Sequence, residues 1–366
     1  MRNSKSNCSL VEWKKLGEVT KIVRGNRVTK SDLLENGKYP VISGGFSPLG
    51  YIDRYNRDKN TITIAQYGSA GYVDWQKDCF WANDVCYSVY PLDGLNNRYL
   101  YYTLINKQYD IYSLRTNAVP AHLPLKALQD IIIPLPSLSE QERIVGILDT
   151  FTSSIENLKA QISLRRKQYE HYRDKLLDLE GKPGVEMKTL GEIGDVCMCK
   201  RIMKEQTSDN GEIPFFKIGT FGGQPDAFIS RELYEEYKTK FSYPKKGEIL
   251  ISAAGTIGRS VIFDGEDAYF QDSNIVWIAN DEKQVINRFL YYIYQIAEWK
   301  TDGGTIKRLY NYNLKNTTIP LPSLEEQSRI VSILDEFEAS IKNLEAQLKE
   351  REKQYEYYRN KLLTFD

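Results

Sequence analysis

The residues whose types and spacing best suit a binding site surround two glycine-rich segments, "GSAG" at Gly68 and "GTIG" at Gly255. Glycine lets a backbone approach a phosphate group or the edge of a base closely, and polar or aromatic neighbours could then contact it. The alternative is an ordinary turn that requires a positive φ. The candidate residues in and beside these segments are Gln66, Tyr67, Gly68, Ser69, Gly71 and Tyr72, and Ser252, Gly255, Thr256, Gly258 and Arg259.

A second pair of segments, "YPVISGGFSPLGY" and "IPFFKIGTFGG", also combines glycine with polar and aromatic residues. The two differ at matched positions, as surfaces that contact different sequences should; an ordinary surface loop is the alternative. Arginine can address guanine, and asparagine or glutamine adenine, through paired hydrogen bonds. The further candidates are Ser43, Gly44, Gly45, Phe46, Tyr51, Arg115 and Asn117, and Lys217, Gly219, Thr220, Gln271, Asn274, Lys307 and Arg308.

Larger elements must position these residues, and the most regular of them is a copied segment. Residues 134–177 and 320–363 align with 30 identities in 44 positions, so the chain repeats a long unit. Each copy predicts one helix of about 60 Å. Ser137 and Ser323 are the expected N-caps, each with a glutamate three residues later that would complete a capping box.

Within each copy, apolar residues recur in alternating steps of four and three, the a and d pattern of a coiled coil. One helix cannot bury such a stripe alone, so we expect the copies to pair antiparallel within the chain; pairing between chains of a homodimer is the alternative. Arg165 and Arg351 interrupt the stripe, and tyrosines follow, which suits partner docking. The residues predicted to pair the helices and dock a partner are Ile144, Leu148, Phe151, Ile155, Leu158, Ile162, Tyr169, Tyr172, Ile330, Leu334, Phe337, Ile341, Leu344, Leu348, Tyr355 and Tyr358.

The regions before the two helices repeat only in outline. "LGEV" is matched by "LGEI" and "NRYLYY" by "NRFLYY", with strand-like runs such as "NTITIAQY" and "SNIVWIAN" between them. The sequence predicts an α+β fold: two small mixed α/β domains, each followed by a long helix, in a pseudo-twofold, quasi-circular arrangement. The expected domains are 1–136, 137–182, 183–322 and 323–366.

Composition is that of an ordinary globular chain, with 41% hydrophobic and 27% charged residues. With no long apolar run and no signal-like start, we expect a cytoplasmic protein without membrane insertion. The five cysteines are expected to be free thiols, and no metal site is predicted. Net charge is zero, although residues 1–136 carry 17 basic against 12 acidic residues, so strong binding of nucleic acid by the chain alone is not expected.

The copied helices and the divergent heads together resemble the DNA-specificity subunits of type I restriction-modification systems. The resemblance covers the whole chain, as two target-recognition domains each followed by a helical repeat of the "PLPSLSEQERIVGILD" type, continued by "LRRKQYEHYRDKLL". "GSAG", "FWANDV" and "GEILISAAGTIGR" look like landmarks of the same family.

This resemblance implies a non-catalytic subunit that binds a two-part, asymmetric site in double-stranded DNA, one half per head. It also implies two methyltransferase subunits docked on the helices, which use S-adenosylmethionine to methylate one adenine per half-site at N6. A restriction subunit would add translocation and cleavage with ATP and Mg²⁺. No cofactor is expected on this chain, and its partners would supply much of the phosphate binding.

Three alternatives come from other classes. A nuclease is suggested by Asp226 ahead of Glu236-x-Lys238, a pattern that can hold Mg²⁺, but "SRELYEEYKTK" predicts a charged helix that would aim these side chains poorly. A methyltransferase would need an Asn-Pro-Pro-aromatic or Asp-Pro-Pro-aromatic motif, and neither occurs. A coiled-coil adaptor that binds only proteins explains the helices but not two divergent heads.

Two further features favour scaffolding over chemistry. The segments "NRYLYY" and "NRFLYY" could stack on bases, but their apolar positions recur at helical spacing and predict core helices instead. His122 and His171 have no triad-like neighbours in the sequence, so we expect them to be structural or exposed.

Overall fold

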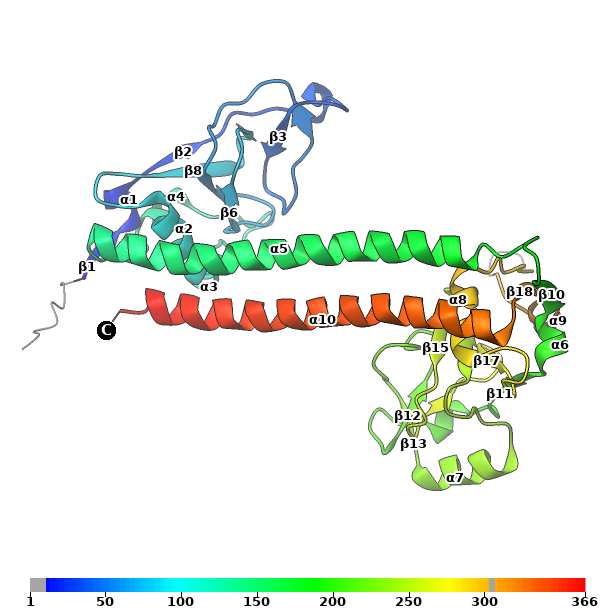
Figure 1. Ribbon diagram of the computed structural model, residues 1–366. Coiled ribbons are helices and arrows are strands. Elements are labelled where there is room, and N and C mark those ends of the chain that lie inside the picture. The colour runs from blue at the N-terminus through cyan, green and yellow to red at the C-terminus, as the bar shows by residue number, and fades with distance from the viewer. Residues whose placement is uncertain (1–10, 303–306, 366) are drawn as a thin grey trace, which may run out of the picture. The chain divides into compact units, whose positions relative to one another are not determined.

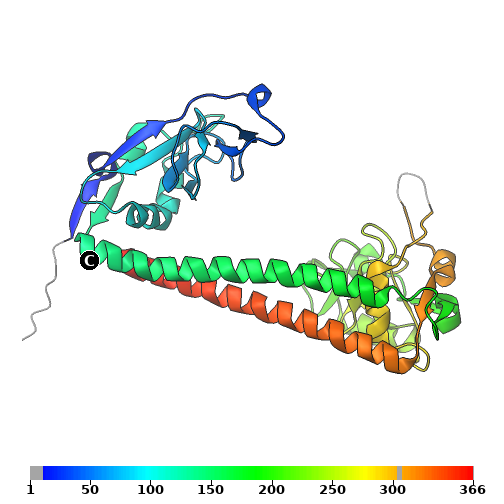
Figure 2. The ribbon, with the colours of Figure 1, turned by 45° about the horizontal axis from the view of Figure 1, so that its top comes forward.

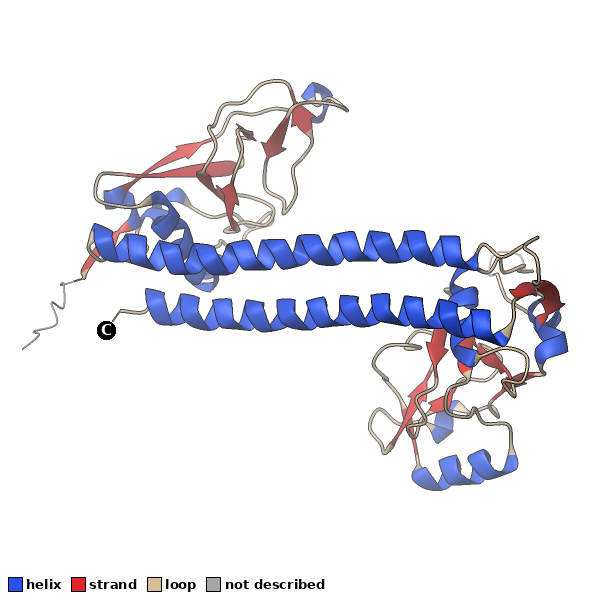
Figure 3. Cartoon of the chain, viewed as in Figure 1, coloured by secondary structure: helices blue, strands red, loops and turns tan. Residues whose placement is uncertain are grey.

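The computed structural model describes residues 11–302 and 307–365. Contacts divide the chain into two compact units, Met1–Ala160 with Glu345–Asp366, and Gln161–Leu344. Each unit contains one globular head and part of both long helices (Figure 1). The same order of strands recurs in both heads. Figure 3 shows that each head combines strands with short helices.

The head of the first unit, head 1, is built around an antiparallel sheet of order β2-β8-β5-β6, with a smaller sheet β4-β3-β7. The central strand β5, "TITIA", is buried at every position, as expected of a β-branched run covered on both faces. The elements are β1 (Glu12–Lys15), α1 (Leu16–Val19), β2 (Thr20–Arg24), η1 (Lys30–Asp32), β3 (Tyr39–Ile42), β4 (Tyr51–Ile52), β5 (Thr61–Ala65), β6 (Val73–Gln76), β7 (Trp81–Ala82), β8 (Cys86–Pro91), α2 (Asn97–Asn106), α3 (Gln108–Ser113), α4 (Leu125–Gln129) and β9 (Ile132–Leu135).

The head of the second unit, head 2, repeats this plan with sheets β11-β17-β14-β15 and β13-β12-β16. Helix α7 is an addition, since the described residues between β4 and β5 of head 1 form no helix. The elements are β10 (Glu186–Thr189), α6 (Leu190–Ile193), β11 (Val196–Met198), η2 (Lys204–Gln206), β12 (Ile213–Phe216), β13 (Phe228–Ile229), α7 (Arg231–Lys240), β14 (Ile249–Ser252), β15 (Ser260–Ile262), β16 (Tyr269–Phe270), β17 (Ile275–Ile278), α8 (Asn287–Ile296), α9 (Asn311–Asn316) and β18 (Thr318–Leu321).

Two helices of 40 residues each follow the heads, α5 (Leu138–Leu177) and α10 (Leu324–Leu363). They pack together antiparallel within the chain, as the sequence predicted, because in the first unit Lys159 forms an ion pair with Glu352 while the later Tyr358 stacks on the earlier Phe151. Figure 2 shows the two helices side by side.

Serine caps begin both long helices. The amide of Glu140 donates to Ser137 Oγ at 3.4 Å, and the second copy repeats this bond at 3.2 Å. The glutamate does not complete a capping box in the predicted way, because its carboxylate forms a two-bond ion pair with Arg143, three residues further along the helix. Each cap therefore satisfies one of the free amides at the start of its helix.

The apolar stripe of each long helix begins in the core of a head and becomes more exposed farther along the helix. Its first positions, Ile144 and Leu148 in α5, are fully buried and join the core of head 1. Ile330 and Leu334 of α10 join the core of head 2 in the same way. Of the other predicted positions, Ile155 and Ile162 are buried, Tyr172 and Tyr358 are exposed, and the half-buried ones are Phe151, Leu158, Tyr169, Phe337, Ile341, Leu344, Leu348 and Tyr355.

The arginine that interrupts each stripe contacts a phenylalanine of the opposite helix. In the first unit, the ring of Phe151 stacks on Tyr358 with 5.3 Å between centroids, and the Arg351 guanidinium lies 5.6 Å from the same ring. This cation–π contact lets a charged residue occupy a stripe position. The corresponding residues of the second unit, at 5.4 and 5.7 Å, are Phe337, Tyr172 and Arg165.

Candidate nucleic-acid interface

The glycine-rich segment of head 1 forms the turn between β5 and β6. Gly68 and Gly71 have positive φ angles of 73° and 86°, and the amide of Gly71 donates to the carbonyl of Ala65 at 2.8 Å. The loop that begins at Ser43 reaches this turn, because the amide of Ser69 donates to the carbonyl of Gly44 at 2.7 Å. The two predicted segments therefore form one surface.

Close approach of the two segments depends on a glycine. A Cβ added to Gly44 would lie 2.2 Å from the carbonyl oxygen of Tyr67, a distance that no side chain can occupy without moving the backbone. Neighbouring Gly45 is exposed, as is Gly68, while Gly71 is buried. Gly71 thus serves the turn, and Gly45 and Gly68 present backbone to solvent.

A third segment, residues 114–124, completes the surface of head 1. The amide of Leu123 donates to the carbonyl of Gln66 at 2.9 Å, and the ring of His122 stacks on Tyr67 with 5.4 Å between centroids. His122 Nδ1 also hydrogen-bonds to Thr116 Oγ1 at 3.0 Å. We expected His122 to be structural or exposed, and its stacking on Tyr67 was not predictable because only the fold brings the two rings together.

The exposed part of the head 1 surface includes an aromatic ring, an arginine and an asparagine. Phe46 is 72% exposed and packs edge-on against Tyr72, with 4.9 Å between centroids. Arg115 is exposed and lies over the ring of Tyr112 at 4.9 Å, and Asn117 is exposed nearby in sequence. These side chains provide faces for stacking and one cation for guanine or phosphate.

Two predicted residues of head 1 have other surroundings. Tyr51 is exposed on β4, where it pairs with Pro40 in the smaller sheet. Gln66 is half-buried, and its Oε1 has no hydrogen-bond partner among the described residues. Neither observation ties these side chains to the surface formed by the three loops.

Head 2 uses the same turn with different side chains. Gly255 and Gly258 have φ angles of 65° and 81°, and the amide of Gly258 donates to the carbonyl of Ser252 at 2.9 Å. The Ser252 hydroxyl is buried, accepts from the amide of Arg259 at 2.9 Å and donates to the carbonyl of Thr256. Ser252 therefore holds the turn, and Gly255, Thr256 and Arg259 are its exposed residues.

The other predicted residues of head 2 converge on this turn. The amide of Ile218 donates to Gln271 Oε1 at 2.9 Å, and the carbonyl of Asn274 accepts from the amide of Ala253 at 2.7 Å. The Asn274 side chain accepts from Arg308 Nη2 at 2.8 Å. Lys217 forms an ion pair with Asp226 at 2.8 Å, and its amide donates to Thr220 Oγ1 at 3.1 Å. Arg259 Nη1 donates to the carbonyl of Phe221 at 3.0 Å. Lys307 is exposed.

Matching hydrogen bonds show which positions correspond in the two heads. Leu309 donates to Ala253 at 2.9 Å, as Leu123 donates to Gln66. The residues before these leucines form equivalent antiparallel bridges: His122 pairs with Tyr67, and Arg308 pairs with Ala254. The backbone frame is thus common to both heads, whereas the side chains on it differ in size and charge.

Comparison with known proteins identifies this arrangement. The family model described as type I restriction modification DNA specificity domain matches residues 9–165 and 183–352. The chain belongs to this family. It is a non-catalytic DNA-specificity subunit, which directs methyltransferase and restriction subunits.

Relatives of this specificity subunit match it over nearly its full length. A Haemophilus influenzae protein named as a type I restriction enzyme specificity subunit is 48% identical, with 98% of this chain and 96% of the relative covered. An Escherichia coli type I specificity subunit is 29% identical over 97% of this chain and 94% of its own. The crystal structure of an S subunit from M. genitalium shares the fold, with a TM-score of 0.69 at 20% identity over 100% and 99% of the two chains.

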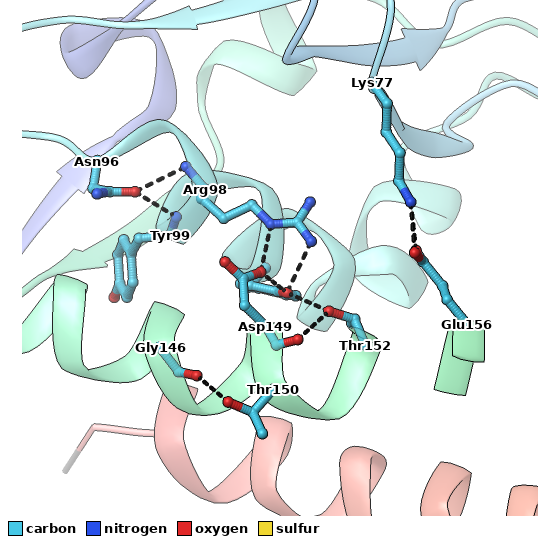
Figure 4. Close-up of polar contacts among 10 residues, drawn as sticks. Lys77, Asn96, Arg98, Tyr99, Gly146, Asp149, Thr150, Thr152 and Glu156 are labelled. Atoms are coloured by element: carbon cyan, nitrogen blue, oxygen red, sulfur yellow. Dashed lines mark hydrogen bonds and ion pairs between the residues drawn. The ribbon is translucent and has the colours of Figure 1, made fainter. Parts of the chain in front are cut away.

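Each head of the specificity subunit is fastened to its long helix by an arginine. Arg98 Nε donates to Asp149 Oδ1 at 2.7 Å (Figure 4). The Tyr102 hydroxyl donates to the same oxygen. Burial is the main cause that raises the pKa of Tyr102, and the hydrogen bond to the Asp149 carboxylate raises this pKa further. In head 2, Arg288 pairs with Asp335 and the neighbouring Glu338, both at 2.6 Å.

The aromatic segments that contain these arginines are scaffold, as predicted. Tyr99, Leu100 and Tyr102 of "NRYLYY" are fully buried, and so are Phe289, Leu290 and Tyr292 of "NRFLYY" to within about one per cent. Their rings fill the core between sheet and helix and are not available to stack on bases.

A buried glutamine makes a second joint in each unit. The Gln141 side chain donates to the carbonyls of Gly94 and Pro136 at 3.1 and 2.9 Å, and accepts from the amide of Asn96 at 2.8 Å. Gln327 makes the corresponding three bonds in the second unit. Both glutamines come from the copied "EQ" of the helix start, which explains why that dipeptide is common to both copies.

The nuclease alternative finds no support in the geometry. Asp226 pairs with Lys217, Glu236 pairs with Lys240 along α7, and Lys238 donates to Tyr234, so the three residues of the pattern have separate partners. Among the described residues, no group of three His, Cys, Asp or Glu side chains could hold a metal ion. The same residues include no helix with the length and apolar character of a membrane span.

Two of the described cysteines are buried thiols. Cys79, Cys86, Cys197 and Cys199 are free, and Cys8 lies outside the described residues. Burial raises the pKa of the Cys86 and Cys199 thiols to about 12, so neither is ionised near neutral pH.

Proposed function

We propose that each head of this specificity subunit contacts one half of a two-part, asymmetric site in double-stranded DNA. The observation that supports this most is the shared frame: the same turn, the same third segment and the same backbone bonds carry different side chains in the two heads. A pair of equivalent surfaces with different chemistry is what recognition of two different sequences requires, because base edges are distinguished by their donors, acceptors and methyl groups.

The partners would supply the chemistry and much of the phosphate binding. Two methyltransferase subunits would dock on the long helices and use S-adenosylmethionine to methylate one adenine per half-site at N6, and a restriction subunit would use ATP and Mg²⁺. The exposed rings of Tyr172 and Tyr358 are candidates for docking contacts, since aromatic residues are enriched at such interfaces. The domains would be 1–136, 137–182, 183–322 and 323–366.

The test is to map N6-methyladenine at base resolution in cells that express a cognate methyltransferase subunit with or without this chain. A two-part motif that appears only with the chain is the expected result. If a purified complex of both proteins forms but no methylation depends on the chain, the adaptor interpretation replaces this one.

A further inference from the structure

Arg308 and His122 occupy one position of the shared frame, because they form equivalent bridges and both lie 12 residues before the proline that opens the copied segment, Pro320 and Pro134. We propose that Arg308 contacts a guanine in the half-site of head 2, and that His122 is the base-contacting residue at the same position of head 1. This inference rests on the proposed division of the DNA site between the heads and names the residues that distinguish the two halves.

The guanidinium of Arg308 is already oriented by its neighbours. Nη2 donates to Asn274 Oδ1 at 2.8 Å, with longer contacts to the carbonyl and hydroxyl oxygens of Ser273 at 3.4 and 3.5 Å. Within the described residues, all hydrogen bonds of this guanidinium run through Nη2. Nε and Nη1 therefore remain for a ligand, and the planar fork can place two donors on the O6 and N7 acceptors of guanine.

The surroundings of Arg308 suit close approach of a DNA groove. The residue opposite it in the bridge is the small Ala254, followed by exposed Gly255. Lys307 beside it is exposed and adds a positive charge, which suits contact with a phosphate group. A half-buried arginine held on one side by an asparagine loses less rotational freedom on binding than a free surface arginine.

The same position in head 1 is adapted to a smaller polar residue. Tyr67 replaces alanine opposite the bridge, and its ring stacks on His122 at an interplanar angle of 22°. Thr116 occupies Nδ1, so Nε2 is the ring atom left for a base edge among the described residues.

Methylation of a DNA library with both half-sites randomised tests this inference, using the complete subunit in complex with its methyltransferase subunits. Arg308→Gln keeps hydrogen-bond donors but favours adenine over guanine. We expect one base pair of the head 2 half-site to change its preference from guanine toward adenine by at least tenfold, with the head 1 half-site unchanged. His122→Ala should relax one base pair of the other half-site.

Arg231→Gln is the matched control, because Arg231 is an exposed arginine of the same head that lies on α7 and pairs with Asp267. Its motif should equal that of wild type. An unchanged motif in the Arg308→Gln complex, or a uniform loss of rate at all sequences, overturns base recognition by Arg308 while leaving the division of the site intact. If that variant methylates nothing, His122→Ala decides: an unchanged motif there overturns the inference. Absence of any two-part motif with wild type instead refutes the proposed function.

Discussion

At the scale of single residues, the copied glutamines show how one side chain can tie a head to a helix. Gln141 is fully buried and satisfies three backbone groups, so Gln141→Leu keeps the volume but leaves an amide and two carbonyls without partners. Each orphaned group costs about 1–3 kcal/mol. We expect the first unit to lose about 3 kcal/mol of unfolding free energy, measured by denaturant unfolding of the purified chain.

Glu142→Ala is the control for this change, because Glu142 is exposed in the same helical turn. It should shift stability by less than about 0.5 kcal/mol. A Gln141→Leu variant as stable as the control would show that the glutamine network contributes nothing to the joint.

A buried carboxylate in head 2 predicts a pH-dependent stability. Burial raises the pKa of Glu248 above its ordinary value of 4.5, although the amide of Lys245 donates to its carboxylate at 2.7 Å. The fold then keeps a proton that the unfolded chain releases, so stability falls as pH rises from about 4.5 through the raised pKa. Glu248→Gln should be more stable than wild type at pH 7.5.

Thermal unfolding at several pH values measures this difference. The gap between Glu248→Gln and wild type should narrow toward acid, where both side chains are neutral. The exposed Glu235→Gln on α7 is the control and should follow wild type at each pH. A variant that is less stable than wild type at pH 7.5 would contradict the prediction.

At the scale of elements, the sequence predicted the helices better than their neighbours. Periodicity identified the stripe that contains Ile144 and Leu148, but it cannot tell which surface covers a stripe, and the structure places these two residues in the core of head 1. Repetition of "NRYLYY" correctly indicated scaffold. The pairing of Arg98 with Asp149 was not predictable, since the two residues are 51 positions apart and only the fold joins them.

In the recognition loops too, local features were predictable from the sequence and contacts between distant segments were not. Glycines at Gly68 and Gly255 were recognisable from local patterns, because their positive φ angles are a local requirement. The bond between Arg308 and Asn274 and the stacking of His122 on Tyr67 depend on a third segment far away in sequence. Local composition carries no information about which distant loop will complete a surface.

The ion pair between Arg98 and Asp149 should limit how far head 1 can move on α5, and this can be tested. Arg98→Ala removes the ion pair with Asp149 and the contact with the Trp75 ring at 4.7 Å, so head 1 should be held less firmly on α5. We expect methylation of the cognate site to fall several-fold and sites whose half-site spacing differs by one base pair to be accepted. Both effects are measured by methylation rates on three DNAs, one with the cognate half-site spacing, one with a spacing one base pair shorter and one with a spacing one base pair longer.

Arg143→Ala is the matched control on the same helix, because Arg143 is exposed and forms a local ion pair with Glu140. It should leave both rate and spacing preference unchanged. Equal loss of activity at all three spacings in Arg98→Ala would mean that the joint contributes stability alone.

At the scale of the whole molecule, two units with separate cores argue for heads that act independently. The core of head 1 draws on Ile144 and Leu148 of α5 and Leu363 of α10, and the core of head 2 draws on a different set of helix positions. Replacing residues 1–136 by the corresponding head of another family member should therefore change one half-site only. The incoming head must supply the counterparts of Arg98 and Tyr102, because Asp149 would otherwise lack both partners.

Base-resolution mapping of N6-methyladenine with the chimaeric subunit measures this outcome. The half-site assigned to head 2 should stay identical, since Arg308 and Asn274, which hydrogen-bond to each other, both belong to the second unit. A chimaera in which both half-sites change would refute independent heads. Recognition would then have to be shared through the long helices, and the two side-chain sets could not be assigned to separate halves of the DNA.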